Sequence, residues 1–197
     1  TALAVYDGDL FAAGEFTSAG GAPASRIARW DGEDWFPLGV GIDPDAPLDV
    51  FTVRDLHVHD DGSGAALYVG GGFGKAGGIT TPGLARWTTA GGWQSIGSFG
   101  GLIESVWSLE TFDPGTGPKL YAAGRYNRIN GAVIQGGVGQ WNGTTWSSIA
   151  ASITGDASTR SHSAPRPITT RSFESATFGS GPPATAAGAS TTLTFTF

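Results

Sequence analysis

The sequence predicts an all-β protein made of β-propeller-type four-stranded blades. Three observations support this: a segment that recurs at intervals of 53 residues, four short strand patterns in each recurrence, and glycine-bearing turns between them. Glycine accounts for 33 of the 197 residues, more than twice its usual share of about 7%. No amphipathic helix with start and stop signals is found in residues 1–150.

The first two strand patterns of each repeat are separated by a turn rich in Asp and Gly. The first pattern begins at Leu3, Leu56 and Leu109. The second pattern places an aromatic residue after its leucine, in residues 10–16, 67–73 and 120–126. Each of these segments carries a glycine, at Gly14, Gly71 and Gly124. Because glycine within a strand permits close backbone approach, these positions predict tight packing near the propeller axis.

The third and fourth patterns of each repeat carry one tryptophan each. The third ends at Trp30, Trp87 and Trp141, and the fourth carries Trp35, Trp93 and Trp146. Asp-Gly, Gly-Gly or Asn-Gly lies between them and supplies the positive φ that hairpin loops require. Tryptophans five or six residues apart on adjacent strands predict cross-strand pairs and packing between blades.

Four antiparallel strands that recur every 40–55 residues are typical of a propeller blade. One such sheet has two apolar faces, so blades must stack on each other around an axis. A parallel β-solenoid is the rival interpretation, but its coils are usually shorter and lack four hairpin turns per repeat. We expect the blades at residues 1–52, 53–104 and 105–150, followed by an Ala/Ser/Thr/Pro-rich tail at 151–197.

Two segments carry a resemblance to a known family. LYVGGGFGKAGG at residues 67–78 and IARWDGEDWFPLG at residues 27–39 resemble the kelch-like blades of large bacterial secreted and cell-surface propeller proteins. They are also similar to the propellers of cell-surface cortical-marker proteins, which are distantly related to the galactose-oxidase propeller. The resemblance covers about residues 1–150 and implies a fold and an extracellular location. It implies no single activity, because such blades serve binding, structural and catalytic proteins alike.

Three repeats are too few to close a ring, because propellers usually have four to eight blades. Residues 151–197 contain no Trp or Tyr; residues 160–183 predict a linker, and only residues 192–197 alternate like a strand. Four outcomes stay open: two chains form a six-bladed ring, the tail builds a fourth blade, the chain is a fragment, or open ends join into a filament. Since soluble monomers rarely expose a large apolar face, we predict self-association through the first and third blades, as a dimer or filament.

The two ends of the sequence give rise to further expectations. Thr1 is not an initiator methionine, so we expect a start that was processed or trimmed. The change in composition near residue 150 also fits an unrelated terminal segment or a shifted reading frame.

Charge and composition exclude several classes. The net charge is −6 and the pI about 4.8, which argues against a nucleic-acid partner because phosphate binding needs a basic surface. Most of the 17 acidic residues lie in residues 1–61, which fits a solvated acidic face or attraction of cations. No apolar run approaches the length of a membrane span. The absence of cysteine excludes disulfides, thiolate metal sites and cysteine-based catalysis, including the cysteine-linked tyrosine of galactose-oxidase-like enzymes.

The densest polar cluster supplies candidate metal ligands at His57, His59 and Asp61. Two His at i and i+2 on a strand face the same way, and with a carboxylate they can bind zinc or copper. The other repeats have no ligands at the two His positions, which favours ordinary strand positions instead. The segment 60–64 is also typical of a turn.

Calcium is the alternative to our expectation of no cofactor. Acidic turns at residues 7–9, 31–34 and 43–45 offer oxygen ligands, but none has the full spacing of a known calcium loop. We expect no enzyme activity, because Glu15 and Glu104 are isolated and no nucleophile-elbow motif is present. Arg29 and Arg86 recur beside a blade tryptophan and predict structural contacts.

The sequence therefore favours a non-catalytic extracellular or cell-surface repeat module that acts as a structural or binding scaffold, with a glycan or protein partner possible through exposed aromatic residues. Two alternatives stay open: a fragment of a carbohydrate-active propeller enzyme, and a subunit of an extracellular filament.

Overall fold

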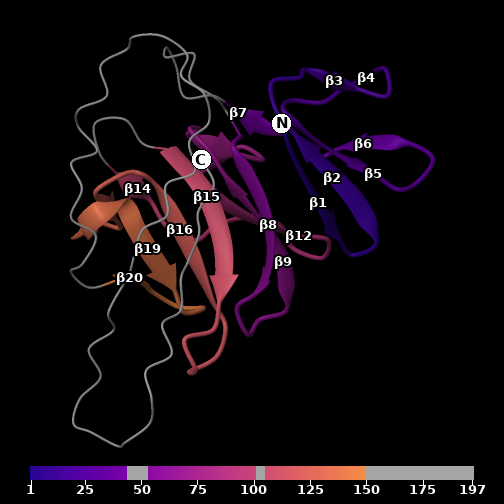
Figure 1. Cartoon of the computed structure of the whole chain (residues 1–197). Helices are drawn as coiled ribbons and strands as arrows, with labels where there is room; N and C mark the ends of the chain where they lie inside the picture. Colours follow the sequence, from indigo (N-terminus) through magenta and orange to yellow (C-terminus); the bar gives the residue numbers. More distant parts are fainter. Residues whose placement is uncertain (44–52, 101–104, 150–197) are drawn as a thin grey trace, which may run out of the picture. The chain divides into compact units, whose positions relative to one another are not determined.

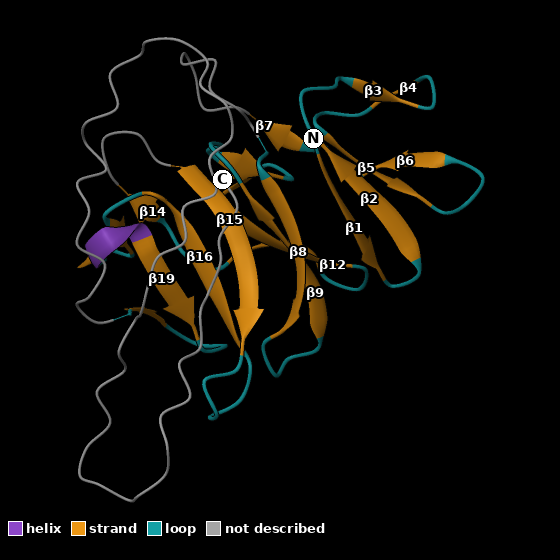
Figure 2. Cartoon of the chain, viewed as in Figure 1, coloured by secondary structure: helices purple, strands orange, loops and turns teal. Residues whose placement is uncertain are grey.

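The structure, a computed structural model, describes residues 1–43, 53–100 and 105–149. All of these belong to the first of two compact units, Thr1–Ile149 and Ala150–Phe197. Strands dominate the described residues, which contain no α-helix and one short 3-10 helix, η1 (Gln135–Gly137) (Figures 1 and 2). No helix in these ranges is long and apolar enough to cross a membrane. The linker and terminal strand expected at residues 160–183 and 192–197 lie outside the described residues.

Three antiparallel sheets of four strands each form the body of this unit. The first consists of β1 (Ala2–Tyr6), β2 (Asp9–Ala13), β5 (Ile27–Trp30) and β6 (Trp35–Pro37). The second consists of β8 (Asp55–Asp60), β9 (Ala65–Gly70), β12 (Leu84–Thr88) and β13 (Gly92–Ser95). The third consists of β15 (Ser105–Phe112), β16 (Lys119–Arg125), β19 (Val138–Trp141) and β20 (Trp146–Ser148). The all-β class and the three repeated four-stranded units are confirmed, while the three sheets do not close into a ring within the described residues.

Small hairpins stand at the glycine turns between the second and third strand of each sheet. They are β3 (Ser18–Ala19) with β4 (Ala22–Pro23), β10 (Lys75–Ala76) with β11 (Ile79–Thr80), and β17 (Arg128–Ile129) with β18 (Ala132–Val133). In two of the three, a short strand that follows the preceding sheet adds to the edge. β7 (Ile42–Asp43) pairs with β10, and β14 (Phe99–Gly100) pairs with β17. The sequence predicted the turns but not these linking strands.

Asp and Asn side chains hold the hairpin turns. Asp60 Oδ1 accepts hydrogen bonds from the amides of Gly62 and Gly64 at 2.8 and 3.0 Å. Asp113 Oδ1 does the same with the amides of Gly115 and Gly117, at 2.7 and 3.0 Å. Such Asx bonds replace backbone pairing in a turn. They confirm that the Asp-Gly segments between the first two strands act as turn formers in the second and third sheets.

The chain adopts a left-handed conformation directly before the third strand of each sheet. The second and third sheets have glycine there, Gly83 and Gly137, with φ of 80° and 66°. The first sheet has Arg26, with φ of 63°. Its amide donates to Phe16 O at 2.9 Å, as the Gly83 amide donates to Phe73 O. The repeated hydrogen bonds thus impose on Arg26 a backbone conformation that favours glycine.

Two apolar cores lie between successive sheets. The first joins Tyr6, Phe11, Ile27 and Leu38 of the first sheet and its linker to Leu56, Leu67 and Val69 of the second. The other joins Ala66, Tyr68 and Leu84 of the second sheet to Val106, Leu109, Leu120 and Trp141 of the third. Alternate residues of β9 therefore enter opposite cores, as the period of a strand requires. This stacking is what the two apolar faces of each blade predicted.

Candidate functional site

The two histidines of the candidate metal cluster share one partner. His57 Nε2 and His59 Nδ1 lie 2.8 and 2.9 Å from Oγ1 of Thr111, which stands on β15 of the third sheet. A hydroxyl can donate one hydrogen bond and accept another, so Thr111 can satisfy both rings at once. The prediction that the two histidines face the same way on their strand is confirmed. Thr111, which contacts both rings, joins the second sheet to the third.

Burial determines the charge of this pair. It lowers the pKa of His57 and of His59 below the ordinary value near 6.5, although nearby carboxylates oppose the effect. Neutral rings suit the contact with Thr111. Its hydroxyl can donate to the lone pair of one imidazole nitrogen and accept from the N–H of the other ring. The pair is therefore a neutral hydrogen-bonded unit at pH 7.

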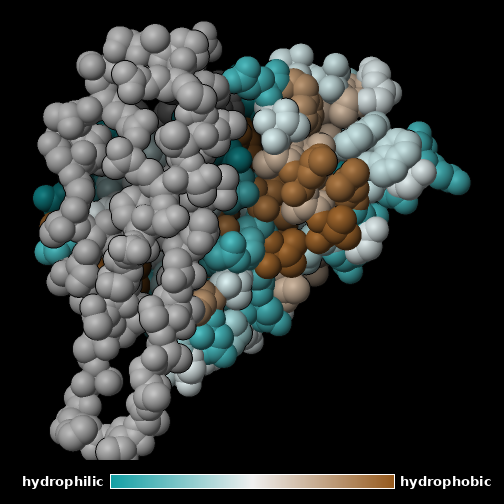
Figure 3. Space-filling view, in the orientation of Figure 1, coloured by the Kyte–Doolittle hydropathy of each residue, from teal (hydrophilic) through white to brown (hydrophobic). Residues whose placement is uncertain are grey.

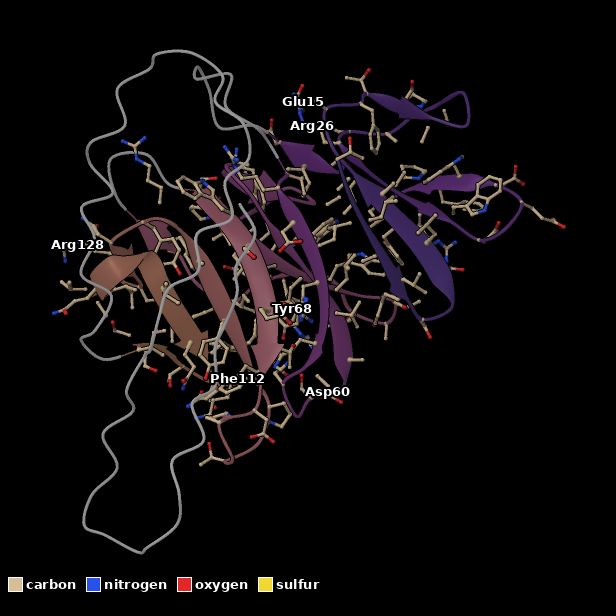
Figure 4. The ribbon with its side chains drawn as sticks, viewed as in Figure 1. Glu15, Arg26, Asp60, Tyr68, Phe112 and Arg128 are labelled. Atoms are coloured by element: carbon tan, nitrogen blue, oxygen red, sulfur yellow. The ribbon has the colours of Figure 1, made fainter. Side chains whose placement is uncertain are left out.

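Asp61, the third candidate ligand, holds the second sheet to the third. Its Oδ1 accepts from the amide and hydroxyl of Ser63 at 3.1 and 2.6 Å. Its Oδ2 accepts from Tyr68 Oη at 3.0 Å and from Trp141 Nε1 at 3.1 Å. Burial alone would raise the pKa of Asp61, but hydrogen bonds from Ser63, Trp141 and Tyr68 outweigh it and lower the pKa to about 2. Figure 4 shows Tyr68 between these two sheets.

The structure does not bring His57, His59 and Asp61 together as ligands of one ion. The histidines bond to Thr111, and the Asp61 carboxylate is occupied by three other side chains. Within residues 1–43, 53–100 and 105–149, no group of three or more His, Asp or Glu lies close enough to hold a metal ion. The metal hypothesis gains no support from this geometry.

The acidic turns offered for calcium also form bonds within the fold. Asp7 Oδ2 accepts from Thr89 Oγ1 at 2.8 Å, and Asp9 forms an ion pair with Arg29 at 2.9 Å. Asp31 Oδ1 accepts from two amides of its own turn at 2.9 Å, and these bonds lower its pKa. Asp45 lies outside the described residues.

Sequence reasoning overlooked Asp55. This carboxylate stands at the start of β8, and its Oδ2 accepts from the Leu109 amide of β15 at 2.6 Å. Burial raises its pKa above the ordinary value. This hydrogen bond is a second polar contact between β8 of the second sheet and β15 of the third. No sequence motif indicated it.

The recurring arginines make contacts within their own sheets. Arg29 pairs with Asp9 and lies 4.9 Å from the centre of the Phe36 ring. Arg86 donates to Gln94 Oε1 at 2.6 Å and to Ser63 Oγ at 2.8 Å, and its buried Nε has no hydrogen-bond partner in the part of the chain that the structure describes. An open groove of about 720 Å³ between the first and second sheets is lined in part by Arg86, Asp7 and Thr89. This lining contains one carboxylate, that of Asp7, which accepts the hydrogen bond from Thr89 Oγ1.

An apolar face of the first sheet is exposed. Leu3 and Val5 of β1 are 63% and 67% accessible, and Figure 3 shows hydrophobic atoms gathered over this part of the molecule. Leu56 and Leu109, which occupy the position of Leu3 in the next two repeats, are 6% and 3% accessible. In those repeats the preceding sheet covers the leucine. The first sheet therefore presents the same face without such a neighbour among the described residues.

The two junctions between sheets share three polar contacts. In each, the tryptophan of the fourth strand donates to the linker of the preceding sheet: Trp93 Nε1 to Leu38 O at 3.0 Å, and Trp146 Nε1 to Ile96 O at 2.8 Å. The turn of the small hairpin donates to the same linker, from Gly77 N to Gly41 O and from Asn130 N to Ser98 O. The third contact is the pairing of β7 with β10 and of β14 with β17.

The first sheet carries the groups that, in the second and third sheets, make these contacts with the preceding sheet. We call this side of each contact the receiving half. Trp35 corresponds to Trp93, Gly20 to Gly77, and β3 to β10. Among the described residues, no carbonyl accepts from Trp35 Nε1 and no strand joins the outer edge of β3. We define the receiving face as Leu3, Val5, Gly20, Trp35 and the edge of β3.

Comparison with known proteins gives no relative: the sequence matches no family model, and no curated protein or solved structure is significantly similar to it.

Proposed function

We propose that the chain is a non-catalytic, extracellular or cell-surface repeat module that acts as a structural or binding scaffold and associates with a further copy of itself. The receiving face carries this proposal. It combines an apolar strand surface, a tryptophan donor and a strand edge that no other described strand pairs with, in the same arrangement that receives a neighbouring sheet twice within the chain.

The apolar part of this face favours association. Burying an exposed leucine or valine side chain contributes about 1.5–3 kcal/mol, and Leu3 and Val5 are both more than half exposed. An unpaired strand edge is also a template for pairing with another chain. A neighbour of the same repeat type would cover the side chains and pair the edge at once.

The polar groups that the sequence offered for chemistry support a structural role. His57 and His59 bond to Thr111, Asp61 bonds to Ser63, Tyr68 and Trp141, and Asp9 pairs with Arg29. Each of these contacts joins strands or turns of the fold. A scaffold needs such contacts, whereas a typical glycoside-hydrolysing site needs two convergent carboxylates that are free to reach the substrate.

The location remains part of the proposal. It is supported by the resemblance of two blade segments to secreted and cell-surface propellers. The absence of cysteine fits an exported protein in an environment without disulfide-forming machinery. A ring and a filament can both arise from the same head-to-tail contact, because the rotation between subunits decides whether the assembly closes.

Size-exclusion chromatography with light scattering tests the proposal. We expect a mass of at least two chains of 20.1 kDa. A mass of 20.1 kDa at every protein concentration would overturn it. Electron microscopy of the same sample distinguishes rings from fibres.

A further inference from the structure

We propose that the receiving face binds the third sheet of a second copy, with the Ile149 carbonyl of that copy as the acceptor for Trp35 Nε1. This inference rests on the proposed self-association and specifies its contact. The partner surface is the outgoing side of the third sheet, meaning the face that in the first and second sheets packs against the following sheet, together with Ile149, which directly follows β20.

The acceptor follows from a rule that both internal junctions obey. In each junction, a carbonyl of the preceding sheet's linker accepts the hydrogen bond from the tryptophan Nε1. That carbonyl belongs to the third residue after the fourth-strand tryptophan of the preceding sheet. Leu38 stands three residues after Trp35, and Ile96 stands three residues after Trp93. The residue at this spacing after Trp146 is Ile149. The third sheet therefore offers the next acceptor of the series.

The outgoing side of each sheet carries an aromatic pair at nearly the same spacing. The ring centres lie 5.9 Å apart in Tyr6–Phe11, 5.9 Å apart in His59–Tyr68, and 6.0 Å apart in Phe112–Tyr121. In the first junction, Trp87 of the following sheet packs on this pair, with ring centres 5.9 and 5.2 Å from Tyr6 and Phe11. Trp30 holds the position of Trp87 in the first sheet. The third sheet thus presents the surface that the first sheet is built to receive.

A second copy is the occupant that fits the number of blades. The receiving half lies on the first of three stacked sheets and the outgoing half on the third. Three blades are fewer than the four to eight of closed propellers, whereas two copies joined by two identical contacts supply six.

Trp35→Phe in the full chain tests the contact, because it removes the Nε1 donor and keeps an aromatic ring. Loss of one such hydrogen bond at a buried interface corresponds to a dissociation constant about tenfold larger, which sedimentation equilibrium can measure. Trp93→Phe is the matched control. It removes the same donor from an internal junction, so we expect it to lower the unfolding temperature and to leave the dissociation constant unchanged.

A further pair guards against an effect of folding alone. Leu3→Asp should abolish association, whereas Val133→Asp, at another exposed position on β18, should leave it intact.

The outcomes separate the inference from the proposed function. If the wild-type chain associates and neither Trp35→Phe nor Leu3→Asp weakens it, the contact lies elsewhere and the inference is wrong, while the scaffold proposal stands. If the wild-type chain is a monomer, both are wrong. A monomer whose unfolding temperature falls on Trp35→Phe would show that the same chain covers its own receiving face.

Discussion

Replacing Asp61 by Asn should destabilise the protein strongly, although the change is nearly isosteric. The carboxylate accepts hydrogen bonds from Ser63, Tyr68 and Trp141. Tyr68 is completely buried and Trp141 is nearly so. In the variant, one of the two oxygens becomes an amide nitrogen, which cannot accept from Tyr68 and Trp141 or from Ser63.

The size of the effect can be worked from these contacts. A buried donor left without its acceptor costs about 1–3 kcal/mol. If the amide nitrogen faces Tyr68 and Trp141, two buried donors are left without an acceptor, which predicts about 2–6 kcal/mol. For a chain of this length, 1 kcal/mol shifts the unfolding temperature by roughly 2–4 °C. We therefore expect a decrease of about 4–24 °C.

The assay is urea unfolding of both proteins between pH 7 and pH 2. Because the pKa of Asp61 is lowered from 3.8 to about 2 in the folded chain, its contribution is complete above the unfolded value and is lost as the pH falls through about 2. The stability difference between wild type and Asp61→Asn should therefore shrink toward pH 2. Asp60→Asn is the control, because Asn142 Oδ1 already holds an equivalent kind of turn, and its effect should stay below about 0.5 kcal/mol. A difference below about 1 kcal/mol at pH 7, or one that does not depend on pH, would refute the reasoning.

Three other predictions concern the fold. Folding stability should fall as the pH drops below about 6.5. The pKa of both His57 and His59 is lowered in the folded state, which then binds fewer protons than the unfolded chain. His59→Gln should reduce the difference in stability between pH 7.5 and pH 5 in urea titrations, and an unchanged difference would contradict the assignment. Arg26→Gly should raise stability by about 0.5–1 kcal/mol in the same assay, since it relieves a left-handed conformation at φ 63°, and destabilisation would show that the arginine side chain matters more than its backbone. Gly77→Ala should cost at least about 2 kcal/mol, because an added Cβ would overlap the Trp93 ring, and retention of the wild-type unfolding midpoint would contradict the packing of that junction.

Local features of the fold were predictable because they depend on nearby residues. The alternation after Leu3, Leu56 and Leu109 and the turns that follow it determine where strands start and end. Asp60 and Asp113 bond to amides two and four residues away, a range that a sequence pattern shows directly. The tryptophan pairs also predicted packing between blades.

Contacts between sheets were harder to predict from the sequence. β7 and β14 have two residues each, and they become strands only because the next hairpin offers an edge. Asp61 was a candidate metal ligand because the sequence shows its carboxylate but not that Trp141, 80 residues later, donates to it. One signal was available for the histidines: Thr111 is polar where the other repeats have Val5 and Val58. That substitution marks the residue that His57 and His59 contact.

The central claim is that the first sheet receives a second copy. Sedimentation equilibrium of the full chain over a hundredfold range of concentration tests this claim most directly. We predict a mass that rises from 20.1 kDa toward that of two or more chains, with the midpoint displaced to higher concentration in Trp35→Phe and not in Trp93→Phe. A single species of 20.1 kDa across the whole range would contradict it.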